Sequence, residues 1–198
     1  MKKIFAFAVS IFLLSSPLGS QTPKACQSIS SPDDRLACYD ALYKTVNSPK
    51  SEGDWDTQIT RSAFDDSTTV TLKLSSLNLI SGRLSEEGPA HMFIRCEEGE
   101  TNLFFAFNGL FMASVGNYGV VNYRIDDNRS RSLHLRESTS NDALGIWNSA
   151  SIGLTRRLFN AETLTIRATP FNKNRVEATF NIQGLREAIQ PLRDACGW

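Results

Sequence analysis

Hydrophobic and polar positions alternate with a period of two through most of the chain after residue 54. Val70, Leu72 and Leu74 alternate with polar residues, a pattern typical of a strand with one buried face. Similar alternation, or a short strand-like run, recurs at Trp55–Thr60, Ala90–Cys96, Thr101–Phe107, Val121–Asp126, Ser132–Glu137, Leu164–Ala168 and Val176–Ile182. We therefore predict a domain dominated by short antiparallel strands.

One of these strands differs from the rest, because both of its faces are apolar. In Thr101–Phe107, Leu103 and Phe105 point one way while Phe104 and Ala106 point the other. A strand with this composition is predicted to lie centrally and to be covered on both sides.

Three segments show the period of a helix instead. The first begins at Ser31-Pro32, a capping residue followed by a proline at the first helical position, and runs to about Thr45. The second is predicted from Ala143 to Phe159, and the third is Gly184–Trp198. Pro191 lies inside the third segment and is expected to kink or break it.

Four cysteines, an even number, favour two disulfides in an exported protein, with three possible connectivities. They are Cys26, Cys38, Cys96 and Cys196. Cys26 lies just before the helix that carries Cys38, which favours a bond between these two. Cys96 points the same way as Met92 and Ile94 on its strand and is predicted to face the core, whereas Cys196 lies on the apolar face of the terminal helix. The second predicted bond therefore joins Cys96 to Cys196 and holds that helix on the sheet.

These elements predict an α+β fold: an antiparallel, sandwich-like β-sheet domain with a short N-terminal disulfide-stapled helix and a C-terminal helix packed on the sheet. The stapled segment is assigned to residues 21–46 and the β-rich domain to residues 55–198. Residues 47–54 are polar, contain Pro and Gly, and are predicted to be a linker.

The first twenty residues have the features of a signal peptide: two lysines, an apolar run from Ile4 to Leu14 and a small-residue region ending at Ser20. The apolar run is shorter than a membrane span, so we expect an exported protein without membrane insertion once residues 1–20 are removed. Removal takes away Lys2 and Lys3 and leaves 19 basic and 21 acidic side chains. This balance argues against nucleic acid as a partner.

Catalytic and metal-binding motifs are not recognisable. His91 and His134 lack the spacing of a metal site, and no Gly-x-Ser-x-Gly or glycine-rich phosphate loop occurs. The cysteines have no Cys-x-x-Cys spacing, and two disulfides would leave no thiol as a nucleophile. We predict neither catalytic residues, a metal nor a cofactor, and expect a protein that is not an enzyme.

The most notable polar group is Arg124 with Asp126, and Ser138 farther along. Two residues apart on a predicted strand, Arg124 and Asp126 are expected to project from one face, about 7 Å apart. They form either a binding surface or ion pairs with neighbouring strands. Asp65-Asp66-Ser67 is interpreted first as a turn or cap and second as a calcium or ligand site.

Seven segments of the chain resemble the VasI/TagO family of type VI secretion system-associated proteins of Gram-negative bacteria. They are Cys26–Asp40, Phe64–Leu72, Phe93–Phe105, Val121–Asp127, Glu137–Asn148, Leu158–Phe171 and Ala178–Trp198. The most specific features are the Arg-Cys turn, the Tyr-Arg-Ile-Asp-Asp strand and the terminal Cys-Gly-Trp.

The resemblance implies a non-enzymatic, periplasmic accessory protein that binds a protein component of a secretion apparatus or of the cell envelope. The alternative is a periplasmic inhibitor or a cell-wall-binding module, in which an arginine such as Arg124 or Arg95 engages carboxylates. A cell-wall hydrolase is the third and least favoured hypothesis.

Overall fold

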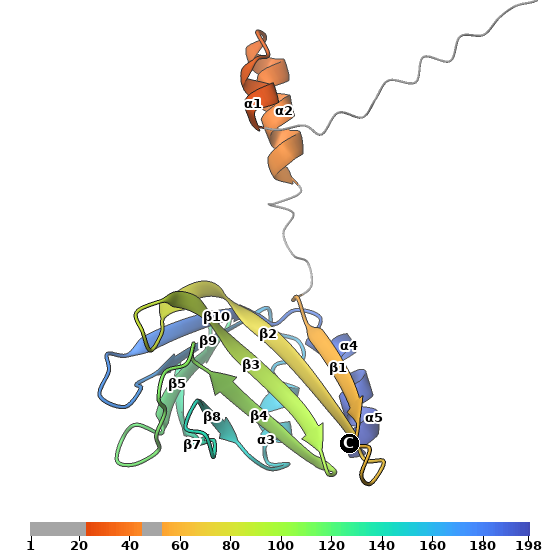
Figure 1. The fold of residues 1–198 in the computed structure, drawn as a ribbon, viewed down its shortest axis with the longest axis vertical. Coiled ribbons are helices and arrows are strands. Elements are labelled where there is room, and N and C mark those ends of the chain that lie inside the picture. The colour runs from red at the N-terminus through yellow and green to blue at the C-terminus, as the bar shows by residue number, and fades with distance from the viewer. Residues whose placement is uncertain (1–22, 45–52) are drawn as a thin grey trace, which may run out of the picture. The chain divides into compact units, whose positions relative to one another are not determined.

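The computed structural model describes residues 23–44 and 53–198, and Figure 1 shows their elements. The chain divides into two compact units between Pro49 and Lys50, and each is described by itself. The predicted signal peptide, residues 1–20, lies outside the described residues, as do residues 47–52 of the predicted linker.

The N-terminal unit is a pair of helices, α1 (Pro23–Gln27) and α2 (Pro32–Lys44). As predicted, α2 starts after Ser31, whose hydroxyl accepts a hydrogen bond from a backbone N–H of the first turn. Cys26 is buried and forms a disulfide with Cys38, with the two Cα atoms 5.5 Å apart. The stapled helix is therefore confirmed, whereas the short α1 was not predicted.

The second unit contains two antiparallel sheets. The larger sheet has the order β1-β2-β3-β4-β8-β7, made from Asp56–Arg61, Thr68–Ser81, Glu87–Glu97, Glu100–Ala106, Ala143–Ile146 and Arg136–Glu137. The smaller sheet has the order β10-β9-β5-β6, made from Val176–Asn181, Thr163–Ala168, Val120–Ile125 and Arg131–His134. The helices are α3 (Ser151–Arg157), α4 (Leu185–Ala188) and α5 (Gln190–Cys196).

The core lies behind the six-stranded sheet. The four-stranded sheet packs against one half of it, and α3 and α5 pack against the other half (Figure 1). Phe105 of β4 and Phe180 of β10 meet in this core, with ring centroids 6.0 Å apart, and both side chains are fully buried. The predicted α+β, sandwich-like fold is confirmed.

Asn78 joins the two sheets where β2 is irregular. The pairing of β2 with β3 shifts between Ser75 and Leu79, which leaves Asn78 free to turn towards β10. Its side-chain amide donates to the carbonyl of Glu177 at 2.9 Å and accepts from the N–H of Thr179 at 2.9 Å. The amide thus forms hydrogen bonds with backbone groups at the edge of β10, as a neighbouring strand would.

The C-terminal segment covers the other half of the core. Its apolar face is buried as predicted, and it breaks into α4 and α5 just before Pro191, which occupies the first turn of α5. Cys196 forms the predicted disulfide with Cys96. Beyond it, the indole N–H of Trp198 donates to the hydroxyl of buried Thr101 at 2.8 Å.

The predicted helix from Ala143 to Phe159 is wrong in its first part. Ala143–Ile146 is strand β8, whose residue Gly145 lies opposite Phe104 of β4. A Cβ atom at Gly145 would lie 2.5 Å from the Cβ of Phe104, so only glycine fits this contact. Pairing with β4 therefore overrides the helical pattern, and the helix is confined to α3.

The predicted strand Ser132–Glu137 is two strands in two different sheets. β6 pairs with β5 and β7 pairs with β8, and buried Leu135 lies between them. The chain therefore crosses from one sheet to the other at this residue.

The expectation that β4 is covered on both sides is also wrong. Its outer face carries Phe104, which is half-buried and stacks between Phe93 and Trp147, with centroid distances of 4.8 and 4.9 Å. Side chains of the same sheet, rather than another layer, surround this ring. Cross-strand aromatic pairs of this kind stabilise a sheet by packing on its surface.

His91 lies next to this aromatic row and makes the stability of the fold depend on pH. Burial, and secondarily the positive charge of Lys73, hold the pKa of His91 below its ordinary value of 6.5. The unfolded chain therefore takes up a proton at higher pH than the folded chain does. The contribution of His91 to the free energy of unfolding is then fully present above pH 6.5 and is lost as the pH decreases below it.

We expect His91→Gln to flatten this dependence, which urea unfolding at a series of pH values between about 7 and 5 would measure. The matched control is His134→Gln, which replaces the chain's other histidine, an exposed one. An unchanged slope in His91→Gln would show that other groups cause the pH dependence.

Candidate functional site

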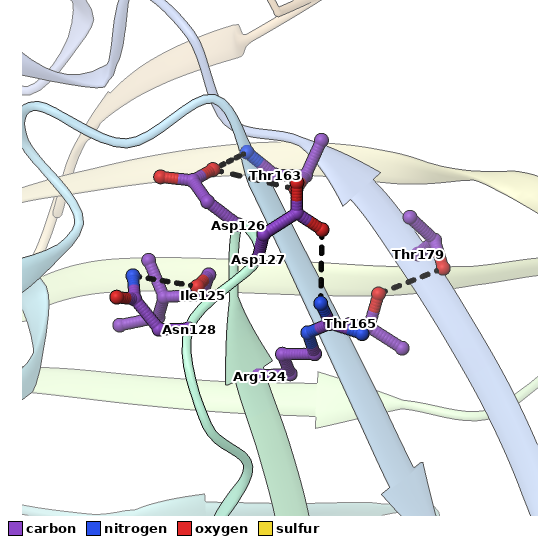
Figure 2. Close-up of polar contacts among 8 residues, drawn as sticks. All are labelled: Arg124, Ile125, Asp126, Asp127, Asn128, Thr163, Thr165 and Thr179. Carbon is purple, nitrogen blue, oxygen red and sulfur yellow. Dashed lines mark hydrogen bonds and ion pairs between the residues drawn. The ribbon is translucent and has the colours of Figure 1, made fainter.

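Arg124 lies on the outer face of the four-stranded sheet, near the end of β5. Its guanidinium donates to the carboxylate of Asp127 at 2.9 Å, and about half of its side chain is exposed (49%) (Figure 2). Asp127 is fully exposed, so the ion pair lies in water and contributes little to stability. Arg124 is therefore held in place but remains accessible to a ligand.

Asp126 does not share a face with Arg124, which corrects the sequence prediction. β5 ends at Ile125, and Asp126 has a φ of 48°, a left-handed turn conformation. Its carboxylate points towards β9 (Figure 2) and accepts hydrogen bonds from the backbone N–H groups of Glu162 and Thr163 at 2.9 and 2.8 Å. Asp126 thus ties the start of β9 to the end of β5.

A pair of variants at Asp126 tests this structural role. Asp126→Ala is expected to lower the free energy of unfolding by about 1–2 kcal/mol, because two backbone donors lose their acceptor. Asp126→Asn keeps the Oδ1 acceptor and tolerates the left-handed conformation, so it should change stability by less than about 0.5 kcal/mol. Chemical denaturation measures the free energy of unfolding of both variants. Equal decreases would mean that the negative charge of Asp126, rather than its acceptor oxygen, stabilises the fold.

Ser138 lies in the tight turn between β7 and β8. Its hydroxyl donates to the carboxylate of Asp142 at 2.7 Å and accepts from the N–H groups of Asp142 and Ala143. Hydrogen bonds from Ser138 and then Ser140 hold the pKa of the Asp142 carboxyl below its ordinary value. Ser138 therefore stabilises a turn of the six-stranded sheet and does not line the depressions at Arg124.

The Ser138 turn nevertheless supports the loop between β4 and β5. Asn141, inside the turn, has a φ of 56°, and its amide donates to the carbonyl of Met112 at 3.1 Å. The N–H of Met112 in turn donates to the carbonyl of Asn141 at 2.7 Å. Because Met112 is completely buried, this loop is anchored and presents its exposed residues in a defined place.

Two open depressions adjoin one another on the outer face of the four-stranded sheet, with volumes of about 550 and 560 Å³. Both include Asn122 of β5 and Arg167 of β9 in their walls. The first extends to Arg124 and Arg129, and the second to residues of the loop before β5. Glu177 lies beside the first depression and pairs with Arg167.

An exposed aromatic cluster borders the second depression and was missed by the sequence analysis. Phe171, in the turn between β9 and β10, contacts Phe111 and Tyr118, with centroid distances of 6.1 and 5.1 Å. Phe111 is 52% exposed and Phe171 is 39% exposed. The signal in the sequence was the presence of aromatic residues in turn segments, which usually carry small polar residues.

The outer face of the six-stranded sheet carries a contact between a serine and a histidine. Ser75 and His91 contact each other at 3.2 Å on the outer face of the six-stranded sheet, the one Ser–His pair that the described residues show. Within residues 23–44 and 53–198 no carboxylate is recorded in contact with His91 to orient the imidazole as a base. Across the same residues, no group of three or more His, Cys, Asp or Glu side chains is placed to hold a metal ion.

Among the described residues, no helix has the length and apolar character to cross a bilayer. Cys26, Cys38, Cys96 and Cys196 are all in disulfides, so these residues offer no free thiol.

Of the comparisons with known proteins, the family model agrees with the resemblance noted in the sequence. No curated protein matches the chain. Invasion associated protein b from Bartonella henselae has a similar crystal structure, with 10% sequence identity and a TM-score of 0.45, covering 74% of this chain and 96% of that chain. A likeness at this level carries no functional argument. The family model described as type VI secretion system VasI, EvfG, VC_A0118 matches residues 25–198, and the chain therefore belongs to the VasI family of type VI secretion system-associated proteins.

Proposed function

We propose that this chain is an exported, periplasmic accessory protein of type VI secretion that binds a protein partner and catalyses no reaction. Membership of the VasI family supports the link to the secretion system. The two disulfides support export, because such bonds persist in oxidising compartments such as the periplasm.

One observation supports the binding role: the outer face of the four-stranded sheet is open. Arg124 and Arg167 are about half exposed there, at 49% each, beside depressions that are partly open to solvent rather than enclosed. Enclosed, mostly apolar cavities are typical of small-molecule sites, whereas open surfaces with arginines and aromatics are typical of protein interfaces.

Affinity capture tests this proposal directly. The tagged protein is cross-linked and recovered from cells with an intact secretion apparatus and from cells that lack it. We expect partners that are recovered only in the first case, and Arg124→Glu should reduce their recovery while Arg83→Glu, in the β2–β3 turn, should not. Recovery of identical partners from both strains would contradict the proposal.

Export is tested separately by osmotic-shock fractionation. The protein should appear in the periplasmic fraction with both disulfides formed. Retention in the cytoplasm with reduced cysteines would contradict the proposed location.

A cell-wall-binding module or a periplasmic inhibitor is the second candidate, favoured by the four arginines in the walls of the two depressions. Arg124, Arg129, Arg167 and Arg175 are suited to carboxylates, including those of peptidoglycan peptides. Sedimentation with purified sacculi and a lysozyme inhibition assay test it, and no effect in either assay would exclude it.

A further inference from the structure

The two depressions on the four-stranded sheet lie next to each other and share Asn122 and Arg167 in their walls; together they are called the groove. The outward side chains of β5 run along it in the order Val120, Asn122, Arg124. From Val120 to Arg124 a strand advances about 13 Å. The groove therefore has the length of four residues of an extended chain, or slightly more.

The two ends of the groove differ in chemistry. At one end are Arg124, Arg129 and hydrogen-bonding groups of the turn after β5. At the other end are Tyr118 and Val120, and Phe171 packs against Tyr118. The first end is suited to an anionic group, whereas the second, which also carries Arg175, offers aromatic surface to an apolar side chain.

The groove is positively charged although the chain is not. Four arginines line it, against the carboxylates of Asp127 and Glu177, which are paired with Arg124 and Arg167. Among the described residues, Arg129 and Arg175 make no ion pair. The whole sequence has equal numbers of acidic and basic side chains, so this positive charge is local.

We propose that this groove binds an extended segment of a partner protein in which acidic side chains lie about four residues from an aromatic one. The proposal rests on the proposed function, since it names the partner chemistry of the same surface. Carboxylates of the segment pair with Arg129 and Arg124, and its aromatic side chain packs against Tyr118 and Phe171.

Two other occupants fit the surface less well. A second copy of this chain would bring two arginine-rich faces together, and like charges across an interface oppose association. A sugar ring stacks on an exposed flat aromatic face, whereas Phe171 meets Tyr118 and Phe111 at 52° and 67°. Rings at such angles form a concave corner that suits a bulky apolar side chain.

The test uses synthetic fluorescent peptides and the purified full chain. The probe has the sequence Asp-Asp-Ser-Gly-Ser-Phe-Gly; one control replaces both aspartates with asparagine, and another replaces the phenylalanine with serine. Fluorescence anisotropy should show that each control binds at least about fivefold more weakly than the probe. Binding of the probe should also weaken as NaCl rises from about 0.05 to 0.5 M, because salt screens exposed charges.

Variants at the two ends of the groove test whether each end contributes to binding of the probe. Arg129→Glu and Phe171→Ser should each weaken binding of the probe by about fivefold or more, by removing an ion pair or an apolar contact. The matched controls are Arg83→Glu and Leu84→Ser, in the exposed β2–β3 turn, which should leave affinity unchanged. Circular dichroism checks that all four variants remain folded.

Charge exchange provides an independent measurement. A peptide with lysines in place of the aspartates should bind the double variant Arg124→Glu/Arg129→Glu more tightly than the unchanged protein.

Equal affinity for the aspartate and asparagine peptides, or no binding of the probe at about 1 mM, would overturn the proposal. Binding of sacculi in the absence of peptide binding, or self-association through this face, would overturn it in favour of the other occupants. If capture from cells still recovers apparatus-dependent partners, only the ligand chemistry has failed. If the peptides bind but no such partners are found, the groove stands and the proposed function has failed.

Discussion

Replacing both Cys96 and Cys196 with alanine is expected to lower the free energy of unfolding by about 4–5 kcal/mol. The two residues are separated by 100 positions, so the bond greatly restricts the unfolded chain. Their Cα atoms lie 5.8 Å apart, which is within the ordinary range for a disulfide, so the folded state accommodates the bond without a shift of the backbone.

Part of the terminal segment should stay attached in this variant. The guanidinium groups of Arg156 and Arg193 lie 5.3 and 5.4 Å from the centroid of the Trp198 ring. Its indole N–H also remains bonded to Thr101. We therefore expect a lower denaturant midpoint with a near-native circular dichroism spectrum, and not a chain that is unfolded in buffer.

The matched control replaces Cys26 and Cys38 with alanine. Their separation of 12 residues predicts a loss of about 3 kcal/mol, confined to the N-terminal unit. Because the two units are separate compact bodies, unfolding of residues 53–198, followed by tryptophan fluorescence, should be unchanged. A loss of under about 1 kcal/mol in the Cys96/Cys196 variant would contradict the chain-entropy argument.

The terminal disulfide also shows why so much of the architecture was predictable. The helical period of the terminal segment predicts that Cys196 faces the core, and the strand period around Cys96 predicts the same for that residue. The two local patterns therefore bring both cysteines to the buried side of the sheet. Leu185, Ile189 and Leu192, on the same face as Cys196, are completely buried. Local patterns succeed here because each element has one buried face and one exposed face.

The errors occur where pairing between distant residues overrides the local pattern. The apolar spacing of Ala143–Ile146 is compatible with a helix. These residues instead form a strand, because they pair with β4. The aromatic residues on both faces of β4 indicated two covering layers. Instead, Phe104 stacks with Phe93 of the adjacent strand β3 and with Trp147, which directly follows β8 and is distant in the sequence.

The candidate site was predictable only in part, for a similar reason. Arg124 lies on an exposed, groove-lining face, whereas Asp126 and Ser138 hold turns together. Whether residue 126 continues a strand or turns away depends on contacts with Thr163, distant in the sequence. The aromatic end of the groove combines residues near 118 with residues near 171, so it has no signature in any single segment.

Phe180→Ala is expected to be nearly as damaging as loss of the terminal disulfide, with a decrease of about 3–5 kcal/mol in the free energy of unfolding. The Phe180 side chain is completely buried and meets Phe105 where the two sheets face each other. Truncation leaves a cavity between the sheets that neither sheet can close without moving its whole hydrogen-bonded ladder.

Phe104→Ala is the matched control, because it removes the same side chain from the outer face of the six-stranded sheet. Phe104 is only half-buried, and its loss breaks stacking with two neighbours without creating a cavity between layers. We expect a decrease of about 1–2 kcal/mol, set by cross-strand aromatic pairing. Urea denaturation of both variants gives the comparison. Equal losses would mean that the outer face of β4 is as deeply packed as the inner face, and that another layer covers it in solution.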